Sequence, residues 1–286
     1  MAAAPPLRVA LVGHGAIGAT VARALRDATH GLERARVTLV AVLTKTARSE
    51  AQRAALAPAL VTSHPAEFLA VDFDVLVECA GQEAVRALAV PCLEAGRRFL
   101  CTSIGALTDD ALMGRVTEAA RLGNTQFQLA SGAMPGIDWM SASALEPGSM
   151  VTAVQTKPPE SWVGARCEPG TTDALPDVVD FETLTEPTVF FEGSARDAAA
   201  YYPKNSNVLA MLALSTAGLD HVTCKLVADP VDRSMRQNIS YAGSAGKITL
   251  DVYGKKSPTN PRTSQVVPLS VIKALRNMSS PVAIGL

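Results

Sequence analysis

A loop with spaced glycines, set between an apolar run and a helical pattern, constrains this chain more than any other feature. The run LRVALVG covers residues 7–13, and the loop carries Gly13, Gly15 and Gly18 in the spacing G-x-G-x-x-G. The following segment, AIGATVARALRDA, places its apolar residues at helical spacing. The glycine spacing alone is a weak signal, but a strand before it and a helix after it are the context that supports it.

Each glycine has a physical role in a loop of this kind. Gly13 permits the tight turn, Gly15 lets backbone N–H groups approach a pyrophosphate, and Gly18 lets the helix pack close to the strand. The helix N-terminus at Ala16 and Ile17 then stabilises the phosphate charge. These five residues are therefore the predicted contacts of a dinucleotide, NAD or NADP. A turn that merely needs glycines remains the alternative.

The end of the second predicted strand, residues 36–44, bears on which nucleotide binds. An acidic residue here would accept hydrogen bonds from the ribose hydroxyls of NAD. The chain instead has Thr44, Lys45 and Arg48, and the first acid is Glu50. A hydroxyl and two cations suit a 2′-phosphate, so NADP is favoured over NAD. The alternative is that both cations are solvated loop residues.

The first half of the chain alternates strands with helices. Further strands are predicted at 73–81 and 98–103, and Ala80, near the end of the first of these, is an additional predicted cofactor contact. A helix ends near Gly96, and the next begins with Thr108 as its N-cap. This alternation predicts an α/β fold with a doubly wound parallel sheet.

The second half is richer in strands, which predicts an α+β substrate and dimerisation domain. QNISYAGSAGKITLDV is predicted to be a hairpin, and SQVVPLSVIKALRN a helix. The Pro- and Gly-rich stretch 158–177 is a candidate lid. The predicted domains are residues 1–135, residues 136–262, and a C-terminal helix in 263–286 that packs back on the first domain.

Composition excludes several classes of partner. The 286 residues carry a net charge of −1 and no basic block, so a small molecule is expected rather than a nucleic acid. Five scattered cysteines, without a Cys-x-x-Cys or Cys/His pair, predict free thiols and no metal site. We found no signal peptide and no apolar run of 18 residues, so a cytoplasmic protein without a membrane span is expected.

Several blocks resemble the L-aspartate dehydrogenase family. They are GHGAIG, VECAG, ASGAMPGIDWMSA, TKPPESWVG, FEGSARDAAAYYPKNSNVLAMLALSTAGLD, LVADP and NPRTSQVVPLSVIKALRN. The resemblance implies an NAD(P)-dependent oxidoreductase acting on the CH–NH2 group of L-aspartate. The product would be iminosuccinate, then oxaloacetate and ammonia, and the reverse reductive amination is equally implied. It also implies that Ala133 and Asn207 contact the cofactor.

The chain departs from the family pattern at its catalytic position. The histidine that serves the family as acid/base falls on Gln237, and a glutamine amide does not titrate near neutral pH. Three interpretations stay open: a slower or direction-biased aspartate dehydrogenase, a reductase of another imine or keto acid, and a replacement introduced at the catalytic residue. A non-catalytic cofactor-binding homologue is the alternative from another functional class, and Gln237 could also be a solvated turn residue.

A dicarboxylate substrate needs cations, and Lys157, Arg166, Lys204 and Arg236 are the candidates. A further departure, Met134–Pro135 with Trp139 nearby, favours an altered substrate pocket. The second-domain sheet is of a kind that often pairs across a two-fold axis, so a homodimer is expected.

Overall fold

The computed structural model describes residues 5–32, 35–165, 179–258 and 260–285. It divides into two compact units, one formed by residues 1–132 and 267–286 and the other by residues 133–266. Arg166, the candidate cation in the predicted lid, lies outside the described residues. Within the described ranges, no helix is long and apolar enough to cross a membrane.

The first unit is built on a parallel sheet in the order β3-β2-β1-β4-β5-β6. Its strands are β1 (Leu7–Val12), β2 (Val37–Leu43), β3 (Leu60–Thr62), β4 (Val75–Glu78), β5 (Arg98–Cys101) and β6 (Phe127–Leu129). The order reverses between β1 and β4, which is where ligands bind in doubly wound sheets. The predicted α/β class and parallel sheet are confirmed.

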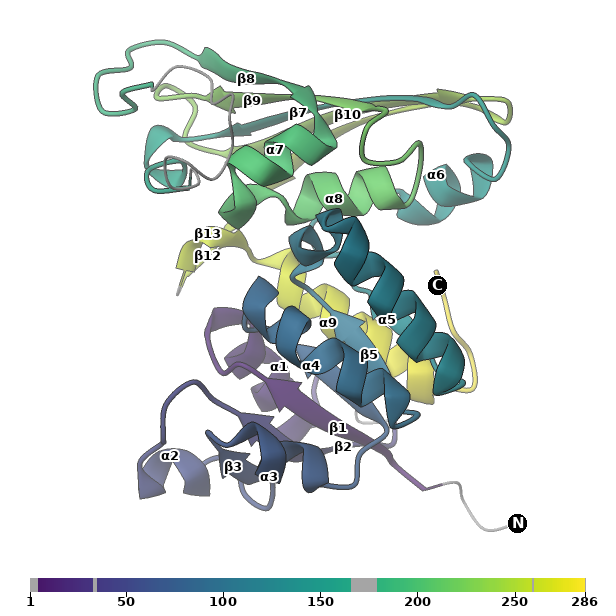
Figure 1. Cartoon of the computed structure of the whole chain (residues 1–286). Helices are drawn as coiled ribbons and strands as arrows, with labels where there is room; N and C mark the ends of the chain where they lie inside the picture. The colour runs from purple at the N-terminus through teal and green to yellow at the C-terminus, as the bar shows by residue number, and fades with distance from the viewer. Residues whose placement is uncertain (1–4, 33–34, 166–178, 259, 286) are drawn as a thin grey trace. The chain divides into compact units, whose positions relative to one another are not determined.

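Helices cover the faces of this sheet (Figure 1). They are α1 (Ala16–Arg26), α2 (Glu50–Ala54), α3 (Pro65–Ala70), α4 (Gln82–Glu94), η1 (Ile104–Thr108), α5 (Asp110–Leu122) and α9 (Val266–Ser279). Val21 of α1 and Val271 of α9 are fully buried in one cluster with Val9 and Leu11 of β1. The C-terminal helix therefore completes the core of the first unit, although it lies far from the rest of that core in sequence.

The predicted N-cap at Thr108 is wrong. Thr108 closes the short helix η1, with its hydroxyl donating to the carbonyl of Gly105. The N-cap of α5 is Asp109, whose carboxylate accepts from the N–H of Leu112 at 3.1 Å. Both residue types cap helices well, and the short helix before α5 moved the boundary by one residue.

The second unit is a mixed sheet in the order β11-β10-β7-β9-β8, with helices on one face (Figure 1). Its elements are α6 (Ile137–Ser143), β7 (Met150–Lys157), η2 (Pro159–Ser161), β8 (Thr188–Ser194), α7 (Ala195–Tyr201), η3 (Pro203–Asn205), α8 (Asn207–Leu214), β9 (Val222–Ala228), β10 (Met235–Gly243), β11 (Gly246–Gly254), β12 (Lys256–Ser257) and β13 (Asn260–Ser264). The predicted hairpin is confirmed as β10 and β11.

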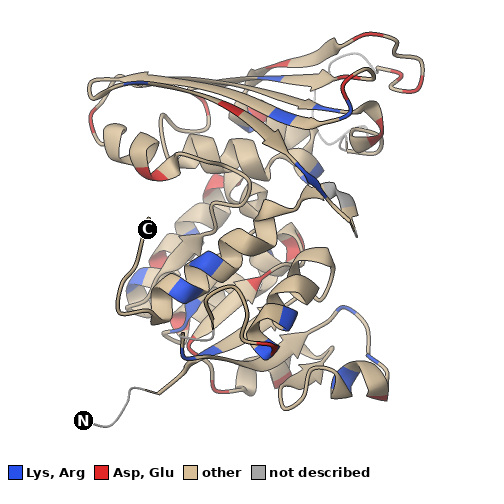
Figure 2. Cartoon of the chain, turned by 180° about the vertical axis from the view of Figure 1, so that it is seen from behind, with Lys and Arg blue, Asp and Glu red and all other residues tan. Residues whose placement is uncertain are grey.

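Charges of both signs are interspersed within each unit (Figure 2). This distribution agrees with the net charge of −1.

Candidate functional site

The glycine loop lies between β1 and α1, at the point where the sheet order reverses. Gly13 has φ +91°, and a Cβ at this position would lie 2.7 Å from the carbonyl oxygen of Cys79. A Cβ at Gly18 would lie 2.0 Å from the carbonyl oxygen of Gly13. Packing within the protein therefore requires glycine at both positions.

Gly15 is glycine for a different reason. Its φ of −87° is ordinary, it is exposed, and a Cβ there would meet nothing within 4 Å. Ala16 and Ile17 follow as the first turn of α1, which has no acidic residue and no side-chain cap. Open space beside N–H groups of a helix N-terminus fits a pyrophosphate. These residues would hold the dinucleotide that the sequence predicts.

The end of β2 supplies the residues expected near the nucleotide ribose. Thr44 is buried, and its hydroxyl donates to the carbonyls of Thr46 and Thr62. Lys45 is exposed. Arg48 is close enough to His14 that its charge adds to the effect of burial in lowering the pKa of His14. The Nε atom of Arg48 is buried and has no hydrogen-bond partner among the described residues.

Glu78, the last residue of β4, is a fully buried carboxylate that sequence analysis missed. Its Oε1 accepts from the N–H groups of Ala80 and Gly81, both at 2.7 Å, and from the hydroxyl of Ser103. Its Oε2 accepts from the N–H groups of Thr102 and Ser103, at 3.2 and 3.0 Å. One carboxylate thus ties the loop after β4 to the loop after β5, and it fixes Ala80 against Gly13.

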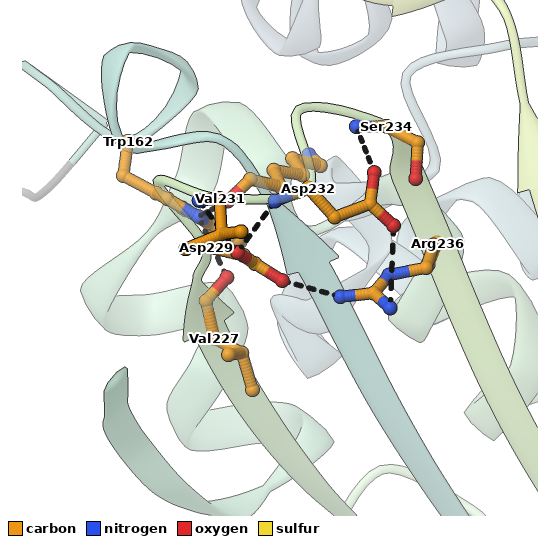
Figure 3. Close-up of polar contacts among 8 residues, drawn as sticks. Trp162, Val227, Asp229, Val231, Asp232, Ser234 and Arg236 are labelled. Atoms are coloured by element: carbon orange, nitrogen blue, oxygen red, sulfur yellow. Dashed lines mark hydrogen bonds and ion pairs between the residues drawn. The ribbon is translucent and has the colours of Figure 1, made fainter. Parts of the chain in front are cut away.

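The segment before β10 is fixed by a buried carboxylate on the second unit (Figure 3). Asp229, 2% exposed, accepts from the N–H groups of Val231 and Asp232, both at 2.9 Å. Its other oxygen accepts from the guanidinium of Arg236, which also pairs with Asp232. Arg236, a predicted substrate cation, is therefore engaged by two carboxylates of its own loop.

Gln237 lies in β10 directly opposite Gln155 of β7. Side chains alternate along a strand, so Gln237 points to the opposite face of the sheet from Arg236. Gln237 shares its face with the buried residues Ile239 and Tyr241. The amide oxygens of Gln237 and Gln155 are both buried and lack a hydrogen-bond partner among the described residues. Gln237 is therefore not a solvated turn residue.

Lys157, the last residue of β7, lies on the same face as Gln155, two residues further along the strand. It is 5% exposed, and its Nζ donates to Oδ1 of Asn205 at 2.5 Å. The same Nζ lies 4.9 Å from the ring centroid of Trp162. Burial lowers the pKa of the Lys157 amine to about 7.

Trp162 holds this arrangement together. It is fully buried, and its indole N–H donates to the carbonyls of Lys157 and Val227. Asn205 is oriented by a bond from its own Nδ2 to the carbonyl of Ser161. Residues 158–165, the described part of the predicted lid, are therefore anchored to the sheet.

The remaining predicted residues are placed as follows. Lys204 is exposed and donates to the carbonyl of Gly164. Asn207 is the first residue of α8, and Ser206, not Asn207, is its N-cap. Ala133 lies in a turn after β6. Trp139 stacks edge-on against Tyr241, with ring centroids 5.6 Å apart.

Comparison with known proteins identifies the family. Residues 138–278 match the family described as aspartate dehydrogenase, C-terminal, and residues 13–130 match that described as homoserine dehydrogenase, NAD binding domain. The L-aspartate dehydrogenase of Ruegeria pomeroyi is 38% identical over 276 residues, covering 96% of this chain and 94% of the relative. That of Ralstonia pickettii is 36% identical over 280 residues, covering 97% and 100%.

Solved structures agree on the fold. The aspartate dehydrogenase of Thermotoga maritima matches with a TM-score of 0.71 at 20% identity, covering 98% of this chain and 99% of that one. A homoserine dehydrogenase from Thiobacillus denitrificans matches with a TM-score of 0.58 at 14% identity, covering 96% and 74%. With the nucleotide loop intact and relatives matched along nearly their whole length, the chain belongs to the L-aspartate dehydrogenase family.

Proposed function

We propose that this protein is an NAD(P)-dependent dehydrogenase acting on the amino group of L-aspartate, in either direction. The observation that carries the proposal is identity of 36–38% to L-aspartate dehydrogenases over nearly the full chain. The open space at Gly15 supports it, because nothing within the protein requires glycine there. A bound nicotinamide would accept a hydride from the α-carbon of aspartate, or return one to the imine.

The residues of the second unit suit an amino acid. The amide oxygens of Gln155 and Gln237 are acceptors without a partner in the described ranges, which suits an ammonium donor. For the carboxylates, Lys204 and Arg166 are the proposed partners, since the guanidinium of Arg236 is occupied by Asp229 and Asp232. Ala133 and Asn207 are the proposed cofactor contacts beyond the glycine loop.

The test is an absorbance assay with NADP⁺ or NAD⁺ and L-aspartate, and with the reduced cofactor, oxaloacetate and ammonia. We expect turnover in at least one direction. Gln237→His should raise the rate of aspartate oxidation by about tenfold, because it restores an imidazole at the predicted acid/base position. An unchanged rate would show that position 237 is not the acid/base position.

A second candidate function is reduction of a different imine or keto acid by NADPH. Gln237 at the expected histidine position and Trp139 packed on Tyr241 favour it. Turnover of other keto acids, without turnover of oxaloacetate, would support this function. Tight NADPH binding with no turnover of any substrate would instead support a non-catalytic cofactor-binding protein.

We propose that NADP is preferred over NAD. The support is the absence of an acid at positions 44–48 and the partnerless buried Nε of Arg48 in the described chain. Replacing Lys45 and Arg48 with glutamine should weaken NADPH binding at least tenfold and NADH binding much less, because a charge-assisted bond to the 2′-phosphate is lost. Arg53→Gln, an exposed cation of α2, is the control. Equal losses for both nucleotides would contradict the preference.

We propose that the protein is a homodimer in the cytoplasm. The face of the second-unit sheet opposite its described helices exposes Met150 and Tyr253, with 71% and 69% of their surface accessible, and could pair across a two-fold axis. Cys79, Cys92, Cys101 and Cys224 are free, which is typical of a reducing compartment.

A further inference from the structure

Three polar side chains gather on the helix-covered face of the second-unit sheet. Gln155 and Gln237 are directly opposite each other on β7 and β10, and Lys157 is two residues beyond Gln155. Directly opposite side chains lie about 5 Å apart at Cβ, and a two-residue step adds about 7 Å. The three side chains therefore lie within a span that one small molecule can cover.

The two glutamines present acceptors on this face. Gln155 is 3% exposed, and its buried amide oxygen lacks a partner in the described part of the chain, as does that of Gln237. A buried polar atom without a partner costs free energy unless a ligand or water satisfies it. Two amide oxygens suit a donor such as an ammonium group.

Lys157 adds a basic group to these acceptors. Its Nζ donates to Asn205 and lies against the indole of Trp162. Burial alone accounts for its lowered pKa of about 7, so near neutral pH a large fraction of the amine is uncharged and keeps a lone pair.

The charged groups of the neighbouring elements are engaged elsewhere. Asp229 accepts from Arg236, Glu160 pairs with Arg233 and Lys256, and Lys204 donates to a backbone carbonyl. Tyr202, from the helical layer, packs against Trp162. Lys157 therefore has no carboxylate partner among the described residues that would hold it in the charged form.

We propose that in this chain, where the glutamine at position 237 cannot take up a proton, Lys157 exchanges the proton of the substrate's amino group, with the amide oxygens of Gln155 and Gln237 holding that group. The inference rests on the proposed function. In oxidation, an N–H bond of the aspartate ammonium breaks, and its proton bonds to the lone pair of the neutral lysine amine. The substrate keeps the electron pair as a free amine, which can then form the C=N bond. In the reverse direction, the lysine ammonium returns the proton.

The proposal separates Lys157 from a residue that merely binds a carboxylate. A carboxylate-binding lysine would be replaced well by arginine, and its loss would act mainly on KM. An arginine cannot accept a proton near neutral pH. We therefore expect Lys157→Arg and Lys157→Met each to lower kcat for aspartate oxidation by about 10²–10⁴-fold. Activity of Lys157→Arg within about threefold of wild type would overturn the proposal.

The pH profile tests the same assignment through a different residue. Oxidation needs the neutral amine, so kcat should fall as pH drops through the pKa of Lys157, near 7. Asn205→Asp puts a carboxylate where Nζ now has an amide oxygen, which favours the charged lysine. The acid limb should move up by at least one pH unit. An unmoved limb would count against Lys157.

A readout without turnover completes the test. The Cε resonance of ¹³C-labelled Lys157, assigned by its loss in Lys157→Arg, should titrate near pH 7 in the ligand-free protein and higher in Asn205→Asp. Titration above pH 10 would refute the proposal. Lys247→Met, an exposed lysine of β11, is the control and should leave rate and profile unchanged.

The outcomes separate the two proposals. If wild type turns over aspartate and Lys157→Met matches it, only the role of Lys157 falls. If wild type fails with aspartate and with oxaloacetate plus ammonia, the proposed function falls and the role of Lys157 falls with it.

Discussion

At the scale of single residues, two ionisable side chains are both buried but differ in how many hydrogen-bond partners surround them. Glu78 is surrounded by donors, four of them backbone N–H groups. Lys157 has one amide acceptor and an indole ring. A buried carboxylate that accepts hydrogen bonds on both oxygens holds its neighbours in place, whereas burial of an amine with few partners lowers the pKa of that amine. The first arrangement suits a rigid loop and the second suits proton exchange.

Glu78→Gln tests the rigid loop. Both carboxylate oxygens accept backbone N–H groups, so the –NH2 of a glutamine would face donors in either orientation. We expect a loss of about 3 kcal/mol in the free energy of unfolding, measured by urea denaturation, and weaker NADPH binding. Glu83→Gln is the control, because the side chain of Glu83 is 93% exposed, and it should change stability by less than about 0.5 kcal/mol. A stable Glu78→Gln protein would show that these bonds matter little.

At the scale of secondary-structure elements, the loop before α1 contains glycines of two kinds. Those at 13 and 18 have no room for a Cβ, whereas that at 15 has open space. The distinction separates what the fold requires from what a ligand requires.

Gly18→Ala and Gly15→Ala should therefore behave differently. A Cβ at position 18 collides with a backbone carbonyl, so we expect about 2 kcal/mol of destabilisation. Gly15→Ala should melt within about 2 °C of wild type yet bind NADPH at least tenfold more weakly. Gly114→Ala, in the middle of α5 with open space around it, should leave binding unchanged. Unaltered affinity in Gly15→Ala would mean that no pyrophosphate lies there.

Strand register explains what the sequence could not predict. The local sequence pattern predicted the alternation of strands and helices, the glycine loop and the hairpin. The pairing of Gln155 with Gln237 depends on register between strands about 80 residues apart, which local pattern does not encode. Glu78 was missed because it ends an apolar strand. Asn205 and Trp162 were missed because Asn205 bonds to Lys157, 48 residues away, and Trp162 bonds to the carbonyl of Val227, 65 residues away. An acid closing an apolar run was the one signal that could have pointed to Glu78.

At the scale of the whole molecule, the open face of the mixed sheet leads to a prediction about assembly. Met150 and Tyr253 lie on this face by their register with Ala242 and Arg236. We expect light scattering to give twice the mass of the 29.9 kDa chain. Met150→Lys with Tyr253→Lys should give monomers that still bind NADPH, because charges would replace apolar contacts. A monomeric wild type would disprove the homodimer.

The contact between Lys157 and Trp162 gives the protein an intrinsic optical probe. The chain has two tryptophans, and the indole of Trp162 is fully buried with Nζ of Lys157 4.9 Å from its ring centroid. A cation at that distance interacts with the ring electrons, and a neutral amine does so far less. Fluorescence emission of the ligand-free protein, with Trp139→Phe to remove the second emitter, should therefore follow the protonation of one lysine and report its pKa without any substrate.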